Sequence, residues 1–364
     1  MDVLSRMKLL AGARERQSAN GGCPRSPIGL ARSRRQTAVM DRASFLKWLG
    51  ATVGSGLFSA AGGASTRETS HRRGAASLPE RPFGRTGLTM PILGLGGWHL
   101  GDAGSERAAR TLLDAAIGEG VRFLDNAESY HAGTAERWLG AAIESLGVRK
   151  QVYVMTKTFD LEHRARDSAA RHLEGSLRRL RTDRLDLWQL HSVRSAEDVD
   201  HAFRRGGAME YILEMQRQGV VRHVGVTGHR DPAANLRALR YWDEGIRFDA
   251  MQLPLNPMDF HQRSFQRHVL PELVKRDIAI IAMKTSADGR LLRSRVCTAT
   301  ECLRFAWSLP ISLAVVGMER PALVRENARL ARELRPMSEA DRRALIDRVA
   351  PRTSLELEPY KVRG

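Results

Sequence analysis

Cysteine is scarce in this sequence, which holds only three in 364 residues: Cys23, Cys297 and Cys302. No two of them form a CxxC pair, so the sequence argues against a zinc or iron–sulfur site. Cys297 and Cys302 stand five residues apart on an expected helix, a spacing that does not indicate a disulfide. We therefore expect free thiols and no metal centre.

Acidic residues are outnumbered by basic ones, and aromatic residues are few. The chain carries 58 Lys and Arg against 41 Asp and Glu, a net charge of +17, and aromatic residues make up 6% of it. Such an excess suggests a nucleic-acid partner. However, residues 1–77, with 13 basic and 4 acidic residues, hold +9 of it, and later arginines alternate with acids along expected helices. Without a zinc-finger spacing, recognition-helix signature or RNP-like aromatic run, solvated helix faces are favoured over nucleic-acid binding.

The N-terminal part lacks the regular spacing of apolar residues that the rest of the sequence shows. Residues 1–39 are rich in Arg, Ser and Gly, and we interpret them as disordered or as upstream of a true start at Met40. From Met40, a charged start precedes an uncharged run from Trp48 to Thr66 and then small residues, which is the layout of a secretory signal peptide. The run is too rich in Gly, Ser and Ala for a stable membrane span. Residues 40–77 are therefore an expected export signal and linker.

The stretch DRASFLK, residues 41–47, resembles the twin-arginine translocation motif. It departs from that motif at Ala43, where the second arginine is expected, and the true pair Arg34-Arg35 is followed by QTAVM instead. A degenerate signal of this kind predicts a periplasmic or exported protein. A cytoplasmic protein with an N-terminal tail is the alternative.

From residue 78 to 364, short apolar runs recur at intervals of roughly 27 to 36 residues. Stretches with helical periodicity, such as 105–120 and 134–147, lie between them. Alternating strands and helices predict an α/β fold with a parallel sheet, and eight such units predict a closed (β/α)8 TIM barrel. The expected strands are residues 91–97, 121–125, 152–157, 185–191, 221–228, 248–255, 278–284 and 312–318.

Elements at both ends complete the expected barrel. Residues 81–96 indicate two short strands joined at Arg85–Gly87, a hairpin that would close the lower mouth. Helices are expected at 320–335 and 338–349, followed by an irregular tail. The alternative architecture, an open doubly wound sheet, needs G-x-G-x-x-G after the first strand. His99 occupies the sixth position of the candidate, so the barrel is favoured.

Four ionisable residues follow consecutive expected strands. Asp125 ends the second strand, Tyr130 lies in the loop after it, Lys157 ends the third strand and His191 ends the fourth. Because barrel active sites lie at the C-terminal ends of the strands, we expect these side chains to meet. A lysine ammonium beside a phenol would lower the phenol pKa from about 10, and a carboxylate would pair with that ammonium. Together with a histidine hydrogen bond, they would form an acid that protonates a carbonyl oxygen as it becomes an alkoxide.

The sequence lacks the catalytic residues that some other enzyme classes require. The sequence offers neither a second carboxylate for glycoside hydrolysis nor a serine at a nucleophile elbow. Reduction would need a hydride donor, hence a nicotinamide cofactor. The alternatives are a nucleotide-binding redox sensor or subunit without turnover, a lyase or isomerase that uses the same acid, and a nucleic-acid binder.

Residues 80 to 335 resemble the aldo/keto reductase superfamily. The resemblance rests on FGRTGLTMPILGLGGW, FLDNAESYHAGTAERWLG, the third strand ending in Lys and the fourth ending in His, in that order. It implies an NADP-dependent oxidoreductase that reversibly reduces an aldehyde or ketone. Tyr130 would be the general acid, Lys157 and Asp125 would tune it, and His191 would orient the carbonyl. The cofactor would be NADPH, with NADH as the alternative, extended across the barrel mouth.

The resemblance also implies cofactor contacts, several of which depart from the family pattern. Gln252 matches a glutamine that contacts the nicotinamide, whereas Thr227-Gly228 replace a usual Ser-Asn and Met283-Lys284 replace a stacking tyrosine. The full implied set is Trp98, Thr227, Gly228, Gln252, Met283, Lys284, Gly317, Arg320, Glu326 and Asn327. We expect a monomer that acts on a small carbonyl compound, without a nucleic-acid partner.

Overall fold

The computed structural model describes residues 77–160, 163–354 and 356–362. The expected disordered segment and export signal, 1–39 and 40–77, lie outside the described residues apart from Ser77. Both interpretations therefore stay predictions.

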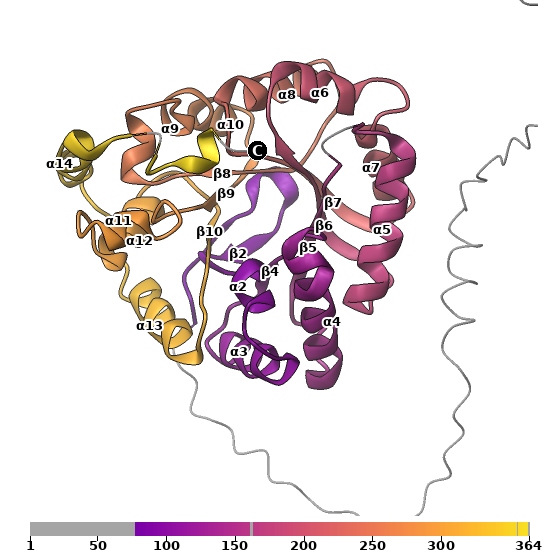
Figure 1. Ribbon diagram of the computed structural model, residues 1–364, viewed down its shortest axis with the longest axis horizontal. Coiled ribbons are helices and arrows are strands. Elements are labelled where there is room, and N and C mark those ends of the chain that lie inside the picture. The colour runs from indigo at the N-terminus through magenta and orange to yellow at the C-terminus, as the bar shows by residue number, and fades with distance from the viewer. Residues whose placement is uncertain (1–76, 161–162, 355, 363–364) are drawn as a thin grey trace, which may run out of the picture. The chain divides into compact units, whose positions relative to one another are not determined.

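Eight parallel strands close into a barrel in the order β10-β3-β4-β5-β6-β7-β8-β9 (Figure 1). Each expected apolar run overlaps one of them, with β5 and β6 extending one and two residues beyond the expected ends, so the predicted (β/α)8 barrel is confirmed. Most residues of the strands are buried on both faces, as expected for parallel strands covered by helices. The strands are β3 Leu93–Gly96, β4 Phe123–Asp125, β5 Tyr153–Thr158, β6 Leu185–Val193, β7 Val221–Gly228, β8 Ala250–Pro254, β9 Ala279–Met283 and β10 Leu313–Val316.

Helices surround the barrel and connect its strands (Figure 1). Their starts follow capping chemistry: the Ser105 side chain accepts from the backbone of Ala108 where α3 begins, which satisfies a backbone donor that the first turn leaves free. The helices are α2 Gly97–Gly101, α3 Glu106–Gly118, α4 Thr134–Leu146, α5 Arg166–Leu180, α6 Ala196–Phe203, α7 Ala208–Arg217, α8 Pro232–Asp243, α9 Phe265–His268, α10 Leu270–Lys275, α11 Arg290–Arg293, α12 Ala299–Trp307, α13 Pro321–Arg332 and α14 Glu339–Val349.

The expectation that Cys297 and Cys302 share one helix is wrong. Thr298 and Glu301 form a capping box, in which each side chain accepts from the other residue's backbone N–H, and α12 therefore begins after Thr298. Such a box fixes a helix start because it satisfies two free donors at once. Cys297 lies before the helix and Cys302 within it, and both are buried free thiols.

A hairpin closes the N-terminal end of the barrel, as the sequence predicts. Strands β1 (Glu80–Pro82) and β2 (Thr89–Pro91) pair antiparallel. Between them Phe83 is fully buried and joins a core cluster with Phe123, Tyr153 and inward residues of other barrel strands. This packing places apolar side chains across the lower end, so the upper end is left for chemistry.

Candidate active site

The four predicted ionisable side chains lie at the C-terminal end of the barrel. Asp125 ends β4, and Lys157 and His191 lie near the ends of β5 and β6, the next two strands around the barrel. Tyr130 begins a short 3-10 helix, η3 (Tyr130–Gly133), between β4 and α4. Parallel strands bring their carboxyl ends to one rim, which explains why residues distant in the sequence meet here.

The segment between β4 and α4, residues 126–133, is called the tyrosine loop below. His131 and Ala132 have φ angles of 50° and 52°, and Gly133 has a φ of 80°, so three consecutive residues are left-handed. Such a conformation costs about 1–3 kcal/mol for a residue other than glycine, so surrounding contacts must hold it. The loop returns Tyr130 to the strand ends, where its Oη lies 3.3 Å from Lys157 Nζ.

Lys157 is the centre of the hydrogen-bond network. Its ammonium donates to Asp125 Oδ1 at 2.6 Å, to the backbone oxygen of Asn126 at 2.8 Å and to Tyr130 Oη at 3.3 Å. The Lys157 and Asp125 side chains are 1% and 4% exposed, so the expected ion pair is present and enclosed. Because an ammonium has three N–H donors, this network uses all of them. Gln252 Nε2 also donates to Asp125 Oδ1, at 3.1 Å.

The expectation that the Lys157 ammonium lowers the pKa of Tyr130 is wrong. Burial of the phenol raises its pKa well above 10, and the carboxylates of Asp125 and Asp288 add to that rise. The Lys157 ammonium, 3.3 Å from the phenol oxygen, favours the tyrosinate form, but desolvation of the phenol and these carboxylates outweigh it in the free protein. Tyr130 is therefore protonated at neutral pH. Since its oxygen accepts from Lys157, its own proton is available to a ligand.

His191 is a neutral imidazole in this setting. Burial is the main cause that lowers its pKa well below 6.5, and the positive charge of Lys157 lowers it further. Its ring packs 5.1 Å from the Phe159 ring and edge-on to Tyr130 at 6.0 Å. Its Nδ1 is buried and has no hydrogen-bond partner among the described residues. A neutral imidazole beside the phenol can donate a hydrogen bond to a carbonyl oxygen.

Trp98 covers the tyrosine loop from the neighbouring helix α2. Its ring packs edge-on against Tyr130 with a centroid distance of 5.4 Å and lies 4.4 Å from the His131 ring. His131 Nε2 also lies 2.9 Å from the Trp98 backbone oxygen. The indole remains 50% exposed, which is unusual for a large aromatic side chain. An exposed indole at this position forms an apolar wall beside the phenol.

The implied cofactor residues follow the other strands of the barrel. Thr227 and Gly228 end β7, Gln252 lies in β8 and Met283 ends β9. The oxygens Thr227 Oγ1 and Gln252 Oε1 are buried without a partner among the described residues. Buried polar atoms are normally paired, so these two are open to a hydrogen-bonding ligand.

The remaining implied cofactor residues differ from one another in burial and in their contacts. The Lys284 ammonium contacts Asp288 Oδ1 at 2.9 Å, so it is already paired. At Gly317, an added Cβ would lie 2.2 Å from the His99 ring, so this glycine admits the imidazole. Arg320 and Glu326 are exposed. Asn327, by contrast, is buried on α13 and faces inward.

Sequence reasoning missed several residues at this rim. The amide of Gln189, two residues before His191 in β6, is buried and unpaired at both Oε1 and Nε2. Gln189 is in register with Lys157 on β5. Its spacing of two residues from His191 places both side chains on the same face of the strand, and this spacing could have identified it from the sequence.

His229, which follows the end of β7, was also missed. Its Nε2 lies 3.2 Å from Ser192 Oγ, and burial lowers its pKa to about 4.

Two further properties concern possible metal ligands and membrane spans among the described residues. No cluster of three His, Cys, Asp or Glu among them could hold a metal ion. In the same part of the chain, every helix is too short or too polar to span a bilayer.

Residues 92–302 match the sequence profile of the Aldo/keto reductase family. The uncharacterized oxidoreductase YrpG of Bacillus subtilis is 27% identical over 238 residues, which cover 60% of this chain and 71% of that protein. The methylglyoxal reductase DkgB of Salmonella typhimurium is 32% identical over 212 residues, 57% of this chain and 72% of that protein. In fold, the chain is similar to the holo form of aldo-keto reductase AKR11C1 from Bacillus halodurans, with a TM-score of 0.61 and 20% identity over 74% of this chain and 96% of that one.

Proposed function

Because this chain belongs to the aldo/keto reductase family, we propose that it reduces an aldehyde or ketone to an alcohol, reversibly, with a nicotinamide hydride and a proton from Tyr130. The observation that carries this proposal is the Lys157 network. Lys157 contacts Asp125 and the phenol oxygen together, which leaves the phenol proton free for the substrate. The substrate class is a small carbonyl compound, and the related methylglyoxal reductase supports that class.

Proton delivery follows from the charges at the site. As the carbonyl oxygen gains negative charge, the phenol proton of Tyr130 moves to it, and tyrosinate forms beside the Lys157 ammonium. The ammonium stabilises that anion because the two atoms are already 3.3 Å apart. No side chain has to move for this stabilisation, which is the condition for efficient electrostatic catalysis. In alcohol oxidation the same pair accepts the proton.

His191 and Trp98 place the substrate. The neutral imidazole of His191, whose ring packs edge-on to Tyr130, donates a hydrogen bond to the carbonyl oxygen, so the oxygen accepts from both His191 and Tyr130. The exposed indole of Trp98 excludes water from one side of the phenol. Excluding water strengthens both hydrogen bonds because the local dielectric constant falls.

The residues of β7 and β8 fit a nicotinamide. A carboxamide both donates and accepts hydrogen bonds, and it would pair with the unpaired Thr227 Oγ1 and Gln252 Oε1. When bound there, NADPH supplies the hydride that no side chain can supply. Arg320, exposed at the start of α13, is a candidate partner for a 2′-phosphate, and this supports NADPH over NADH.

The proposal is tested with purified protein, NADPH or NADH, and a panel of aldehydes and ketones that includes methylglyoxal. We expect NADPH absorbance to fall only in the presence of a carbonyl compound, with NADH less effective. Tight nucleotide binding without turnover of any compound would instead identify a nucleotide-binding subunit.

The Tyr130 phenol is expected to remain protonated beyond pH 10 in the free protein, because burial raises its pKa well above that value. The measurement is the tyrosinate ultraviolet absorbance during an alkaline titration, taken as wild type minus Tyr130→Phe. Urea-unfolded protein is the control, since an unfolded tyrosine titrates near pH 10. A difference signal that is complete below pH 10 would contradict the assigned environment.

Gln252→Leu is expected to weaken NADPH binding roughly 2- to 10-fold, the loss of one hydrogen bond worth about 0.5–1.5 kcal/mol. The substitution removes the unpaired Oε1 and also the donor to Asp125. Affinity is measured by quenching of tryptophan fluorescence. Gln216→Leu is the matched control, because Gln216 contacts Asp249 just before β8, at the opposite end of that strand. Unchanged affinity in Gln252→Leu would remove this residue from the cofactor site.

A further inference from the structure

The backbone conformation of the tyrosine loop has to be held by contacts with other elements of the structure. Three consecutive left-handed residues, His131 to Gly133, separate Tyr130 from α4. Without tertiary contacts, residues of this kind revert to more favourable backbone conformations. The position of Tyr130 therefore depends on whatever holds the far end of the loop.

Glu136, in the first turn of α4, is a fully buried carboxylate behind the site. It accepts from Thr156 Oγ1 at 2.5 Å and from Arg179 Nε at 2.6 Å. Thr156 immediately precedes Lys157 in β5. Glu136 thus joins the helix that follows the tyrosine loop to the strand that carries the lysine. A buried carboxylate in this position is retained only with a charged partner, which Arg179 provides.

Arg179, near the end of α5, also packs against the loop itself. An added Cβ on Gly133 would lie 2.8 Å from Arg179 Cδ, so the arginine side chain crosses directly over the last loop residue. Its guanidinium then reaches Glu136. One side chain therefore contacts the end of the loop and the carboxylate behind it.

The same helix holds the start of the loop. His172 Nδ1 lies 2.9 Å from Glu128 Oε1, and that carboxylate accepts from the Phe159 backbone N–H at 2.7 Å. His172 and Arg179 stand seven residues apart on α5, which places them two turns apart on one face. Helix α5 contacts the loop on both sides of Tyr130.

We propose that Glu136 and Arg179 are positioning residues for the carbonyl reduction, because they fix the end of the tyrosine loop relative to Lys157. This inference rests on the proposed function. Neither side chain contacts the reacting atoms. Their contribution is to keep Tyr130 Oη at its distance from the ammonium, so their loss lowers kcat more than it changes substrate or cofactor affinity.

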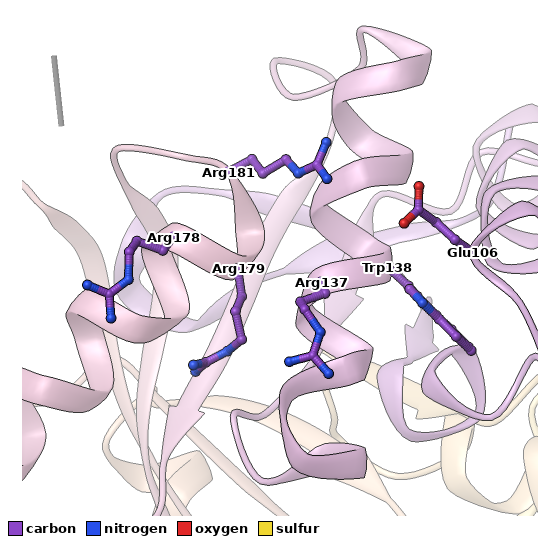
Figure 2. A pocket seen from close by; sticks show the side chains of 6 residues that line it. All are labelled: Glu106, Arg137, Trp138, Arg178, Arg179 and Arg181. Atoms are coloured by element: carbon purple, nitrogen blue, oxygen red, sulfur yellow. The ribbon is translucent and has the colours of Figure 1, made fainter. Parts of the chain in front are cut away.

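The surroundings of Arg179 make this inference testable by chemical rescue. Arg179 lines a surface cavity of about 340 Å³, together with Glu106, Arg137, Trp138, Arg178 and Arg181 (Figure 2). Truncation of the arginine would therefore leave a space open to solvent beside Glu136. A small guanidinium ion could enter it and restore the charge pair.

The experiment compares Arg179→Ala, Arg179→Lys and wild type in kcat, KM and NADPH affinity, with and without methylguanidinium. We expect kcat to fall about 10²-fold in Arg179→Ala, the order of loss for a misplaced catalytic group, with KM and NADPH affinity nearly unchanged. Methylguanidinium and Arg179→Lys should each restore part of kcat. The matched control is Arg181→Ala, which removes another arginine from the same cavity, one that pairs with the exposed Glu144; its kcat should stay at the wild-type value.

A second variant covers failure of Arg179→Ala to fold. Glu136→Gln with Arg179→Met removes both charges, so no buried charge is left unpaired, and kcat should again fall with affinity retained. Wild-type kcat in either variant, equal losses of kcat and affinity, or no response to both methylguanidinium and lysine would overturn the positioning role. An absence of carbonyl turnover in the wild type itself would show instead that the proposed function fails, and this inference with it.

Discussion

Tyr130→Phe is expected to reduce carbonyl turnover by about 10²–10⁴-fold, the range for loss of a general acid. The substitution removes the phenol proton and the oxygen that accepts from Lys157 at 3.3 Å, but it keeps the ring that packs against Trp98. The apolar wall beside the site should therefore be preserved, and NADPH affinity should stay nearly unchanged. The measurements are steady-state reduction of the best substrate of the panel and a fluorescence titration with NADPH.

Two outcomes would contradict the role of Tyr130. A variant with near wild-type turnover would show that another group donates the proton. A large loss of NADPH affinity would show that the phenol binds the cofactor. Tyr211→Phe is a suitable control, because Tyr211 lies on α7 against Trp188, among the helices outside the barrel.

Lys157→Met is expected to abolish turnover and to lower the free energy of unfolding by about 3–5 kcal/mol. Methionine has a similar volume, so the main effect is electrostatic: among the described residues, Asp125, 4% exposed, would keep only the amide of Gln252 as a side-chain partner. A buried carboxylate without a charged partner is unfavourable, because it has lost its hydrating water molecules and gained no ion pair in return. The reduction assay measures the loss of turnover, and urea denaturation followed by tryptophan fluorescence measures the loss of stability.

The double variant Asp125→Asn with Lys157→Met separates the two effects. It leaves no buried charge at this position, so most of the lost stability should return, while turnover should remain absent because tyrosinate has no ammonium beside it. If the double variant were as unstable as the single one, the loss would come from the contacts of Lys157 with Asn126 and Tyr130 rather than from unpaired charge.

The barrel could be predicted from the sequence because its strands are buried on both faces. Burial of this kind requires continuous apolar runs such as Ile278 to Met283, and eight of them at similar intervals leave few other architectures. Asp125, Lys157 and His191 could be placed for a related reason: each follows such a run, and the ends of parallel strands meet. At these three positions, the local sequence pattern therefore indicates where the side chain lies in the folded barrel.

Other features depend on contacts between residues that are distant in the sequence. Lys361 in the C-terminal tail is fully buried, with its ammonium 2.9 Å from Asp259 and 2.8 Å from Glu358. The sequence indicated only an irregular tail, and the structure shows short 3-10 turns there, η5 (Ala350–Arg352) and η6 (Pro359–Lys361). Nothing in the residues around Lys361 points to Asp259, about 100 positions earlier.

The sequence also predicts the wrong direction for the pKa shift of Tyr130. Residue types at the strand ends identify the neighbouring charges, and from those alone a lysine beside a phenol predicts a lowered pKa. Desolvation depends on how much surrounding structure covers the group, and the sequence does not show this. In the folded chain desolvation is the larger cause, so the direction of the shift is reversed.

The hairpin that closes the lower end of the barrel also constrains how the chain reaches its native state. Arg81 donates to the backbone oxygens of Trp307 at 2.6 Å and of Ile311 at 3.1 Å, contacts that span 226 and 230 positions. During synthesis, Phe83 would thus leave the ribosome long before the segments that bury it. Docking of the first strands has to wait for those segments, so the apolar surface of Phe83 stays uncovered until they are made. The hairpin that completes the folded barrel therefore also leaves apolar surface exposed during synthesis.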